Sequence, residues 1–96
     1  MEYQIIFSTY NNKTKQQKTR LELERDLVEL AKQNDLAGFS LTDQLGYWAG
    51  ELEQSHILTL LDVSKQKAFG LAEQIRDKYE QEAVIVRPVK QVNYFI

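Results

Sequence analysis

Hydrophobic and polar residues alternate along several short stretches of the chain, and this is the period of a β-strand. Residues 3–10 and 39–47 alternate in this way, whereas residues 57–63 and 83–86 are hydrophobic at both phases. A continuous hydrophobic run is typical of a strand that is covered on both faces. Pro88 should interrupt the fourth strand, because proline has no N–H to donate to a sheet hydrogen bond.

Two other segments repeat their hydrophobic residues at the period of an α-helix. Thr19 and Glu22 have the capping-box spacing, in which each side chain bonds the backbone N–H of the other residue. Ser64 is suited to be the N-cap of the second helix. The hydrophobic stripes consist of Leu23, Leu27, Leu30 and Ala31 in the first helix and of Ala68, Leu71, Ala72, Ile75 and Tyr79 in the second.

The elements follow one another in the order β-α-β-β-α-β. This order predicts an α+β, ferredoxin-like βαββαβ sandwich, with an antiparallel sheet and two helices on one face. Residues 92–96 predict a short extra C-terminal strand at an edge of the sheet. A chain of 96 residues has room for one such core, so we expect residues 1–96 to form a single domain.

Only one face of this sheet would be covered by helices, yet the strands at residues 57–63 and 83–86 are hydrophobic at both phases, and Ile6 adds a hydrophobic residue to the second phase of the strand at residues 3–10. Ile6, Leu58, Leu60, Val84 and Val86 could lie on either face, because the alternation alone does not assign them. A large exposed hydrophobic face is normally buried against another molecule. We therefore expect the protein to associate with further copies of itself.

The stretch from Gly46 to Asp62 holds the only tryptophan and the only histidine of the chain. Tyr47 and Trp48 are aromatic residues with a polar group, which suits the margin of an interface. Gly46 and Gly50 would permit a bend, with residues 49–54 as the turn. In the alternative interpretation Trp48 covers the core of its own chain and Gly50 is only a turn residue. The residues expected at an interface or an inter-subunit cleft are Tyr47, Trp48, Gly50, Glu51, Glu53 and His56.

Composition restricts the chemistry that the chain can carry out. It has no cysteine and one histidine, so thiolate chemistry is excluded and a zinc site would lack ligands. His56 with Glu51, Glu53 and Asp62 would make at most a weak carboxylate-rich site, and solvated side chains are the preferred interpretation. No catalytic constellation and no glycine-rich phosphate-binding motif is present. We expect no cofactor, no metal and no catalytic residue.

Charge and hydropathy disfavour two classes of partner. The net charge of −2 is unfavourable for binding to the phosphates of nucleic acid. Lys13, Lys15, Lys18 and Arg20 form a local basic cluster, for which a solvated loop is the preferred interpretation and nucleic-acid binding the alternative. No run of hydrophobic residues is long enough to cross a bilayer, and the first residues do not have the pattern of a signal peptide. We expect a cytoplasmic protein with no membrane partner.

The segment Gly46-Tyr47-Trp48-Ala49-Gly50-Glu51 resembles the hairpin of the CutA family. Residues 75–85 (IRDKYEQEAVI) and 93–96 (NYFI) are similar to that family's second-helix end and closing strand. The resemblance covers residues 46–96 and implies the ferredoxin-like fold and the compact trimer of the CutA and PII-like group. The chain departs from the family in having no cysteine in its second strand and in having Lys78 and Gln81 around Tyr79-Glu80. A role in metal binding is therefore not carried over.

We interpret the sequence as that of a small cytoplasmic, homo-oligomeric binding or regulatory module of the PII/CutA-like type. A trimer is favoured and a dimer stays open; a small-molecule ligand, not identified by the sequence, would bind between subunits near residues 47–53. One alternative is a dimeric ferredoxin-like enzyme with a pocket between sheet and helices, to which His56, Tyr3 and Tyr10 could contribute. Another is a protein of a phage or mobile element that binds a host partner.

Overall fold

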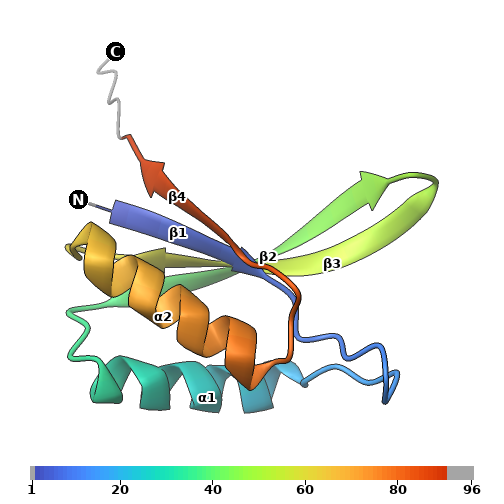
Figure 1. Ribbon diagram of the computed structural model, residues 1–96, viewed down its shortest axis with the longest axis horizontal. Coiled ribbons are helices and arrows are strands. Elements are labelled where there is room, and N and C mark those ends of the chain that lie inside the picture. The colour runs from blue at the N-terminus through green and yellow to red at the C-terminus, as the bar shows by residue number, and fades with distance from the viewer. Residues whose placement is uncertain (1, 91–96) are drawn as a thin grey trace.

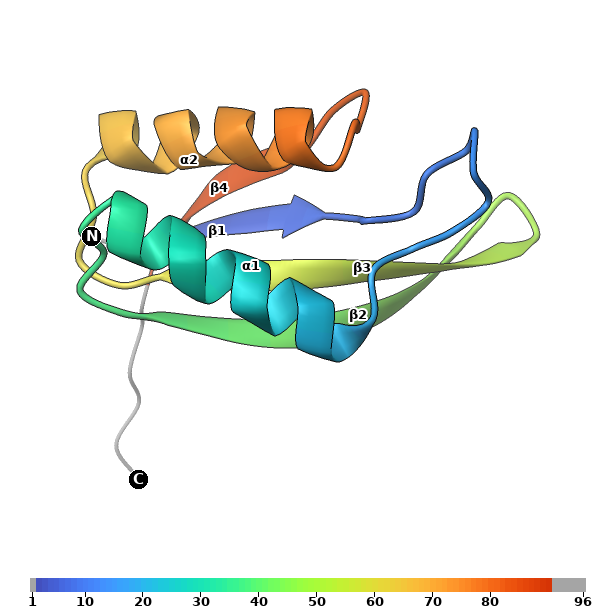
Figure 2. The ribbon, with the colours of Figure 1, turned by 90° about the horizontal axis from the view of Figure 1, so that it is seen from below.

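The elements occur in the predicted order and form one four-stranded sheet covered by two helices. The computed structural model describes residues 2–90, apart from the side chain of Trp48. Its elements are β1 (Glu2–Phe7), α1 (Arg20–Gln33), β2 (Phe39–Trp48), β3 (Glu51–Leu60), α2 (Lys65–Lys78) and β4 (Ile85–Val89). The sheet has the order β2-β3-β1-β4, and neighbouring strands are antiparallel. Both helices lie on the same face, which confirms the predicted ferredoxin-like α+β fold (Figures 1 and 2).

Both helices begin at the predicted caps. The backbone N–H of Glu22 donates to Thr19 Oγ1 at 3.2 Å, and the backbone N–H of Thr19 donates to Glu22 Oε1 at 3.1 Å, so the capping box is formed. The hydrogen bond from the Thr19 backbone N–H, to which the Thr19 side chain adds, holds the pKa of the Glu22 carboxyl below its ordinary value. Ser64 caps α2 by accepting a hydrogen bond from the backbone N–H of Lys67 at 3.1 Å.

The core lies between the helices and one face of the sheet. Tyr3, Ile5 and Phe7 of β1 alternate toward the helices and are buried. The predicted stripe of α2 is buried in full, and in α1 the three leucines are buried while Ala31 is half-buried. Their other buried partners are Leu58, Leu60 and Val63.

The opposite face of the sheet is more polar than predicted. Leu58 and Val86 both pair with Ile5 and therefore lie on the helix-covered face, as does Leu60. The open face keeps a row of three hydrophobic residues, in which Ile6 pairs with Ile57 and Ile85. The prediction of a hydrophobic second face is wrong for β3, because the strand ends at Leu60 and the following Leu61 and Val63 leave its alternation.

A polar row crosses the open face beside these isoleucines. Gln4 Nε2 donates to Thr59 Oγ1 at 3.3 Å, and Arg87 Nε donates to Gln4 Oε1 at 2.8 Å. These contacts join β3, β1 and β4 on the side that has no helix. The open face therefore carries both hydrophobic and polar residues, and polar side chains of neighbouring strands form hydrogen bonds with one another.

The turn between β2 and β3 is shorter than predicted. It consists of Ala49 and Gly50, with φ values of 51° and 82°. Two successive positive φ angles are the conformation that joins antiparallel strands without disturbing their twist. Pairing runs without interruption from Phe39 and Leu60 to the turn, so Gly46 makes no bulge and Gly50 is the turn residue of the alternative interpretation.

Two further predicted boundaries change for related reasons. β3 begins at Glu51, six positions before the predicted start at residue 57, because the short turn leaves residues 51–56 free to pair with β2. Pro88 does not end β4, which continues to Val89. β4 is an edge strand, where a missing N–H is tolerated. The predicted strand at residues 92–96 lies outside the described residues.

The β2–β3 hairpin extends past the rest of the sheet. His56, which is paired with Phe7, is the last residue of β3 in this direction that has a partner in β1. Residues 44–55, which we call the arm, therefore form a two-stranded ribbon that projects beyond the helices (Figure 1). One edge of β3 is unpaired with β1 along the arm.

The two glycines at positions 50 and 70 should respond in opposite ways to alanine. Nothing lies within 4 Å of a Cβ at either site, so backbone conformation decides the result. Gly50→Ala should destabilise the fold by about 1–2 kcal/mol because its φ is positive. Gly70→Ala, inside α2, should stabilise it by about 1 kcal/mol. Urea unfolding of both variants measures this, and two changes of the same sign would contradict the turn conformation.

Candidate functional site

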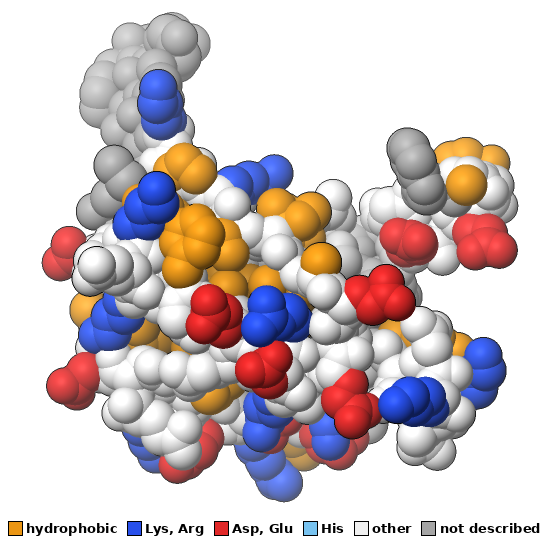
Figure 3. All heavy atoms as spheres, viewed as in Figure 1, with side chains coloured by type: hydrophobic (Ala, Val, Ile, Leu, Met, Phe, Trp, Pro, Cys, Tyr) orange, Lys and Arg blue, Asp and Glu red, His pale blue; other side chains and the backbone are white. Residues whose placement is uncertain are grey.

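A groove of about 640 Å³ lies between the arm and the chain that follows β1. The space-filling view shows how the arm stands away from the body of the molecule on this side (Figure 3). Three stretches of the chain line the groove: residues 8–17, residues 51–55 of β3, and Gln81 after α2. It is larger than three other hollows among the described residues, which have volumes of about 320, 270 and 200 Å³.

Tyr10 is held at the wall of this groove by its backbone. Its N–H donates to Ser8 Oγ at 3.1 Å, and its carbonyl accepts from Gln81 Nε2 at 3.0 Å. The same Gln81 nitrogen also donates to the carbonyl of Tyr79 at 3.0 Å. The Tyr10 side chain is 41% exposed. An aromatic ring is thus presented to the groove from a backbone that is fixed on both sides.

The chain after Tyr10 is folded into a closed turn. Asn11 Oδ1 accepts hydrogen bonds from the backbone N–H groups of Lys13 at 2.8 Å and Thr14 at 3.2 Å. Asn11 Nδ2 donates to Glu80 Oε2 at 2.6 Å, which ties the turn to the end of α2. The predicted basic cluster is divided between this turn and the start of α1. Lys18 Nζ lies 3.9 Å from Glu22 Oε2 and forms an ion pair with it there.

The groove is acidic. Glu51 and Glu53 line it, and no lysine or arginine is among its lining residues. Both carboxylates lie on the phase of β3 that faces away from the helices, since β3 alternates and Leu58 and Leu60 face the core. Two uncompensated carboxylates beside an aromatic ring favour a cationic ligand and repel an anionic one.

The other face of the arm is hydrophobic. Tyr47 pairs with Leu52, and Leu45 lies two residues earlier on the same phase. Their exposed fractions are 73%, 69% and 65%, higher than those of the other exposed large hydrophobic residues that the structure describes. A cluster of this kind on a projecting ribbon is a candidate interaction surface.

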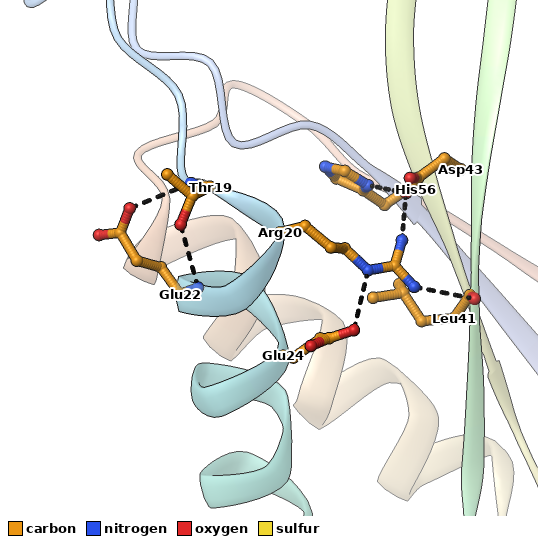
Figure 4. Close-up of polar contacts among 7 residues, drawn as sticks. All are labelled: Thr19, Arg20, Glu22, Glu24, Leu41, Asp43 and His56. Atoms are coloured by element: carbon orange, nitrogen blue, oxygen red, sulfur yellow. Dashed lines mark hydrogen bonds and ion pairs between the residues drawn. The ribbon is translucent and has the colours of Figure 1, made fainter.

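A polar cluster joins the base of the arm to the start of α1 (Figure 4). Asp43 Oδ1 accepts a hydrogen bond from Arg20 Nη1 at 2.7 Å and lies 2.8 Å from His56 Nδ1. Arg20 Nε also donates to Glu24 Oε1 at 3.2 Å. The His56 ring lies 5.5 Å from the ring of Phe7. One carboxylate oxygen thus connects β2, β3 and α1 at the point where the arm leaves the sheet.

Two pKa values are displaced around this part of the core. The hydrogen bond from His56, together with the charge of Arg20, holds the pKa of the Asp43 carboxyl below its usual value. Burial raises the pKa of the Tyr79 hydroxyl, and its hydrogen bond to Asp26 Oδ2 at 2.8 Å adds to the effect. The Tyr79 ring stacks on Phe7 with centroids 6.0 Å apart. Tyr79 is therefore a structural, protonated residue between the two helices.

The structure separates the residues that the sequence analysis grouped together. Glu51 and Glu53 line the groove, Tyr47 lies on the opposite face of the arm, and Gly50 forms the turn. His56 lies at the base of the arm with Asp43, on the opposite phase of β3 from the two glutamates. Among residues 2–90 no group of three side chains is arranged to hold a metal ion.

Asp43 was missed by the sequence analysis, although a signal for it exists. A charged residue at position 43 falls on the phase of Phe39 and Leu41, which face the core. A two-residue turn at positions 49 and 50 places residue 43 directly opposite His56. Recognition of the turn from Ala49-Gly50 would have predicted this pair.

Comparison with known proteins gives similarity in structure only. No family model matches the sequence, and neither does any curated protein. A phage SAM lyase in its apo state is 25% identical with a TM-score of 0.70, the alignment covering 88% of this chain and 75% of that one. A phage SAM lyase in complex with S-methyl-5′-thioadenosine is 23% identical with a TM-score of 0.67, over 88% of this chain and 76% of that one.

CutA and PII-like proteins are also among the structural neighbours. CutA1 from Pyrococcus horikoshii is 20% identical with a TM-score of 0.55, over 97% of this chain and 87% of that one. A putative PII-like signalling protein from Thermus thermophilus is 23% identical with a TM-score of 0.50, over 90% and 78%. The chain has the ferredoxin-like fold of these proteins, and the predicted resemblance to the CutA and PII-like group is confirmed. Neither helix described here is long and hydrophobic enough to span a membrane.

Replacement of Asp43 by asparagine should change the acid limb of the stability curve. Because the pKa of Asp43 is lowered in the folded state, its ionised carboxylate contributes to the free energy of unfolding. This contribution is fully present above the unfolded pKa of about 4. The contribution is lost as the pH falls through the lower folded pKa. Since Asp43 is well exposed, we expect a loss of about 0.5–1 kcal/mol at pH 7.

Urea unfolding of the wild type and Asp43→Asn between pH 7 and pH 2.5 measures this difference. The control is Asp77→Asn, which removes the same charge from the surface of α2. The difference between wild type and Asp43→Asn should shrink at acid pH. A difference that stays constant down to the lowest pH would contradict the shared hydrogen bond.

Proposed function

We propose that the protein is a self-assembling, small-molecule-binding module of the PII/CutA-like type, with a cationic adenosine derivative as its ligand. The observation that carries the proposal is the acidic groove in which Glu51 and Glu53 lie near the fixed Tyr10. The assembly is proposed to be a trimer, in keeping with the resemblance to the CutA and PII-like group. The protein is proposed to act in the cytoplasm.

Self-association is supported by the arm. Leu45, Tyr47 and Leu52 expose about two thirds or more of their side chains on a ribbon that has no helix beneath it. The edge of β3 along residues 51–55 lacks a partner in β1, so its backbone groups are free to pair with another strand. A second copy that covers the hydrophobic face of the arm would also close one side of the groove, which shares Leu52 with that face.

The class of ligand is supported by the chemistry of the groove. S-Adenosylmethionine carries a sulfonium charge, which two carboxylates and the face of a tyrosine can stabilise. A nucleoside triphosphate would bring negative charge to a groove that has no basic lining residue. The phage SAM lyase that shares the fold was solved with S-methyl-5′-thioadenosine, which retains the adenosine part and lacks the charge.

A second candidate function is SAM lyase activity, which is favoured by the similarity to the phage enzyme at 25% identity. Loss of the aminocarboxypropyl group from S-adenosylmethionine leaves S-methyl-5′-thioadenosine, and sulfur keeps the electron pair of the broken bond. A lyase uses no second substrate. The carbon of the aminocarboxypropyl group that was bonded to sulfur must therefore receive its new electron pair from another atom of S-adenosylmethionine itself. The groove carboxylates would then bind and orient the sulfonium group, whose charge is lost when the bond breaks.

Assembly should depend on the hydrophobic face of the arm. Light scattering at about 10 µM should give a wild-type mass that is a multiple of 11.2 kDa. Tyr47→Ser combined with Leu52→Ser should shift the mass to that of the monomer, because the apolar contact is lost. Leu21→Ser, at an exposed position of α1, is the control and should leave the mass unchanged. A monomeric wild type would overturn the proposed assembly.

Ligand binding should depend on charge in the groove. Calorimetry should show that Glu53→Gln lowers the affinity for S-adenosylmethionine about tenfold, equivalent to about 1.4 kcal/mol. The affinity for S-methyl-5′-thioadenosine should fall much less. Glu73→Gln, on α2 outside the groove, is the matched control. Chromatography of the same mixtures for released S-methyl-5′-thioadenosine tests the lyase alternative. Absence of binding of both compounds at millimolar concentration would overturn the proposed ligand.

A further inference from the structure

A second hollow, of about 320 Å³, adjoins the acidic groove. Tyr10 and Asn12 line the groove, and Gln17 lines both spaces. Thr9 and Asn11, which alternate with the first two residues along the chain, line the second hollow. The start of α1 and the end of α2, which lie at the same end of the molecule, complete its lining (Figures 1 and 2). The two spaces therefore lie on either side of one short segment of chain.

The second hollow differs from the groove in its charges. Two ammonium groups and two carboxylates belong to its lining residues Lys18, Lys78, Glu22 and Glu80. Lys18 Nζ lies 3.9 Å from Glu22 Oε2 and both side chains are about half exposed, so this ion pair is weak. Among residues 2–90, Lys78 forms no ion pair. Glu80 Oε2 accepts a hydrogen bond from Asn11 Nδ2 at 2.6 Å, and its other oxygen can accept a further donor.

A buried hydroxyl adds a donor to this set. Thr9 is 6% exposed, and its Oγ1 accepts a hydrogen bond from the backbone N–H of Lys18 at 3.1 Å. A threonine hydroxyl can donate one hydrogen bond in addition to those that it accepts. In the part of the chain that the structure describes, no acceptor bonds this hydrogen. The hydroxyl can therefore donate to a ligand in the second hollow.

Given the proposed function, on which this inference rests, we propose that the second hollow binds the α-amino-acid group of the ligand whose sulfonium group lies in the acidic groove. The carboxylate of S-adenosylmethionine is repelled by Glu51 and Glu53, so it requires a cationic partner outside the groove. Lys78 and the hydroxyl of Thr9 bind this carboxylate, and Glu80 binds the neighbouring ammonium group.

The ligand can occupy both spaces at once. A short chain of single bonds joins the sulfonium sulfur to the amino and carboxyl groups, and Gln17 lies where this chain passes from one space to the other. Sites for whole small molecules have volumes of about 300–1,000 Å³, so about 320 Å³ is sufficient for an amino-acid group. The groove would then recognise the sulfonium and adenosine parts, and the second hollow would distinguish ligands by their carboxylate.

Decarboxylated S-adenosylmethionine separates the two contributions. It keeps the sulfonium and ammonium groups and lacks the carboxylate, so its net positive charge is larger. An acidic groove acting alone should therefore bind the decarboxylated compound more tightly. With the second hollow, we expect calorimetry of the wild type to show the opposite order, with S-adenosylmethionine bound about tenfold more tightly.

Lys78→Met should remove this preference. The affinity for S-adenosylmethionine should fall about tenfold, because the carboxylate loses its cationic partner. The affinity for the decarboxylated compound should not fall, since the variant only removes a positive charge near a positive ligand. Lys32→Met is the matched control, because it removes the same charge from the last turn of α1, outside the second hollow. It should leave both affinities unchanged.

The possible results distinguish failure of the subsite from failure of the proposed function. If the wild type binds the decarboxylated compound equally or more tightly, the subsite is wrong while the groove still binds its ligand. An equal loss of affinity for both compounds in Lys78→Met would give Lys78 a structural role and overturn its contact with the carboxylate. Free L-methionine bound as tightly as S-adenosylmethionine would make a free amino acid the occupant and overturn the connection between the two spaces. Binding of neither adenosine compound would overturn the ligand proposed for the groove, and the subsite with it.

Discussion

The two-residue turn at Ala49 and Gly50 is the constraint on which the arrangement of the arm depends. Its two positive φ angles fix the register of β2 on β3 for ten residue pairs. That register places Asp43 opposite His56 and Tyr47 opposite Leu52, and it directs Glu51 and Glu53 to the other face. Because side chains alternate between faces, a shift by one residue would move the carboxylates to the hydrophobic side and leave Asp43 without His56.

Three short structural elements position the acidic groove, and each is held by hydrogen bonds of side chains. The turn at Asn11 is closed by its own side chain, Gln81 holds the carbonyl of Tyr10, and Asp43 joins the base of the arm to α1 through Arg20. These contacts form before any ligand is present. Most of the conformational entropy of the groove is therefore lost on folding, so that less is lost when a ligand binds.

Most of the fold could be predicted from the sequence because its signals are local. The caps at Thr19 and Ser64 and the hydrophobic stripes of both helices depend on residues within one or two helical turns. The strand limits were less accurate, since Ala49-Gly50 was not recognised as a complete turn and Pro88 was given too much weight. The alternation alone could not assign Leu58 and Leu60 to a face of the sheet, because the face depends on the register of β3 against β1.

The site could be predicted only in part. Glu51 and Glu53 were expected at an interface or an inter-subunit cleft, which stays a prediction, and the structure places both at the groove within one chain. Their grouping with His56 followed from proximity in the sequence, whereas the structure places His56 with Asp43 and Arg20. Arg20 and Asp43 are separated by 23 positions, and Tyr10 and Gln81 by 71, so no short motif connects them.

The way in which the arm leaves the sheet has a consequence for how the sequence can vary. β1 is paired on both sides and holds the core, while residues 51–55 pair only with β2. Substitutions in the arm therefore act on a ribbon that can open locally at a small free-energy cost, with the buried layer beneath the helices left intact. Selection can alter which molecules this surface recognises without first having to compensate a loss of overall stability.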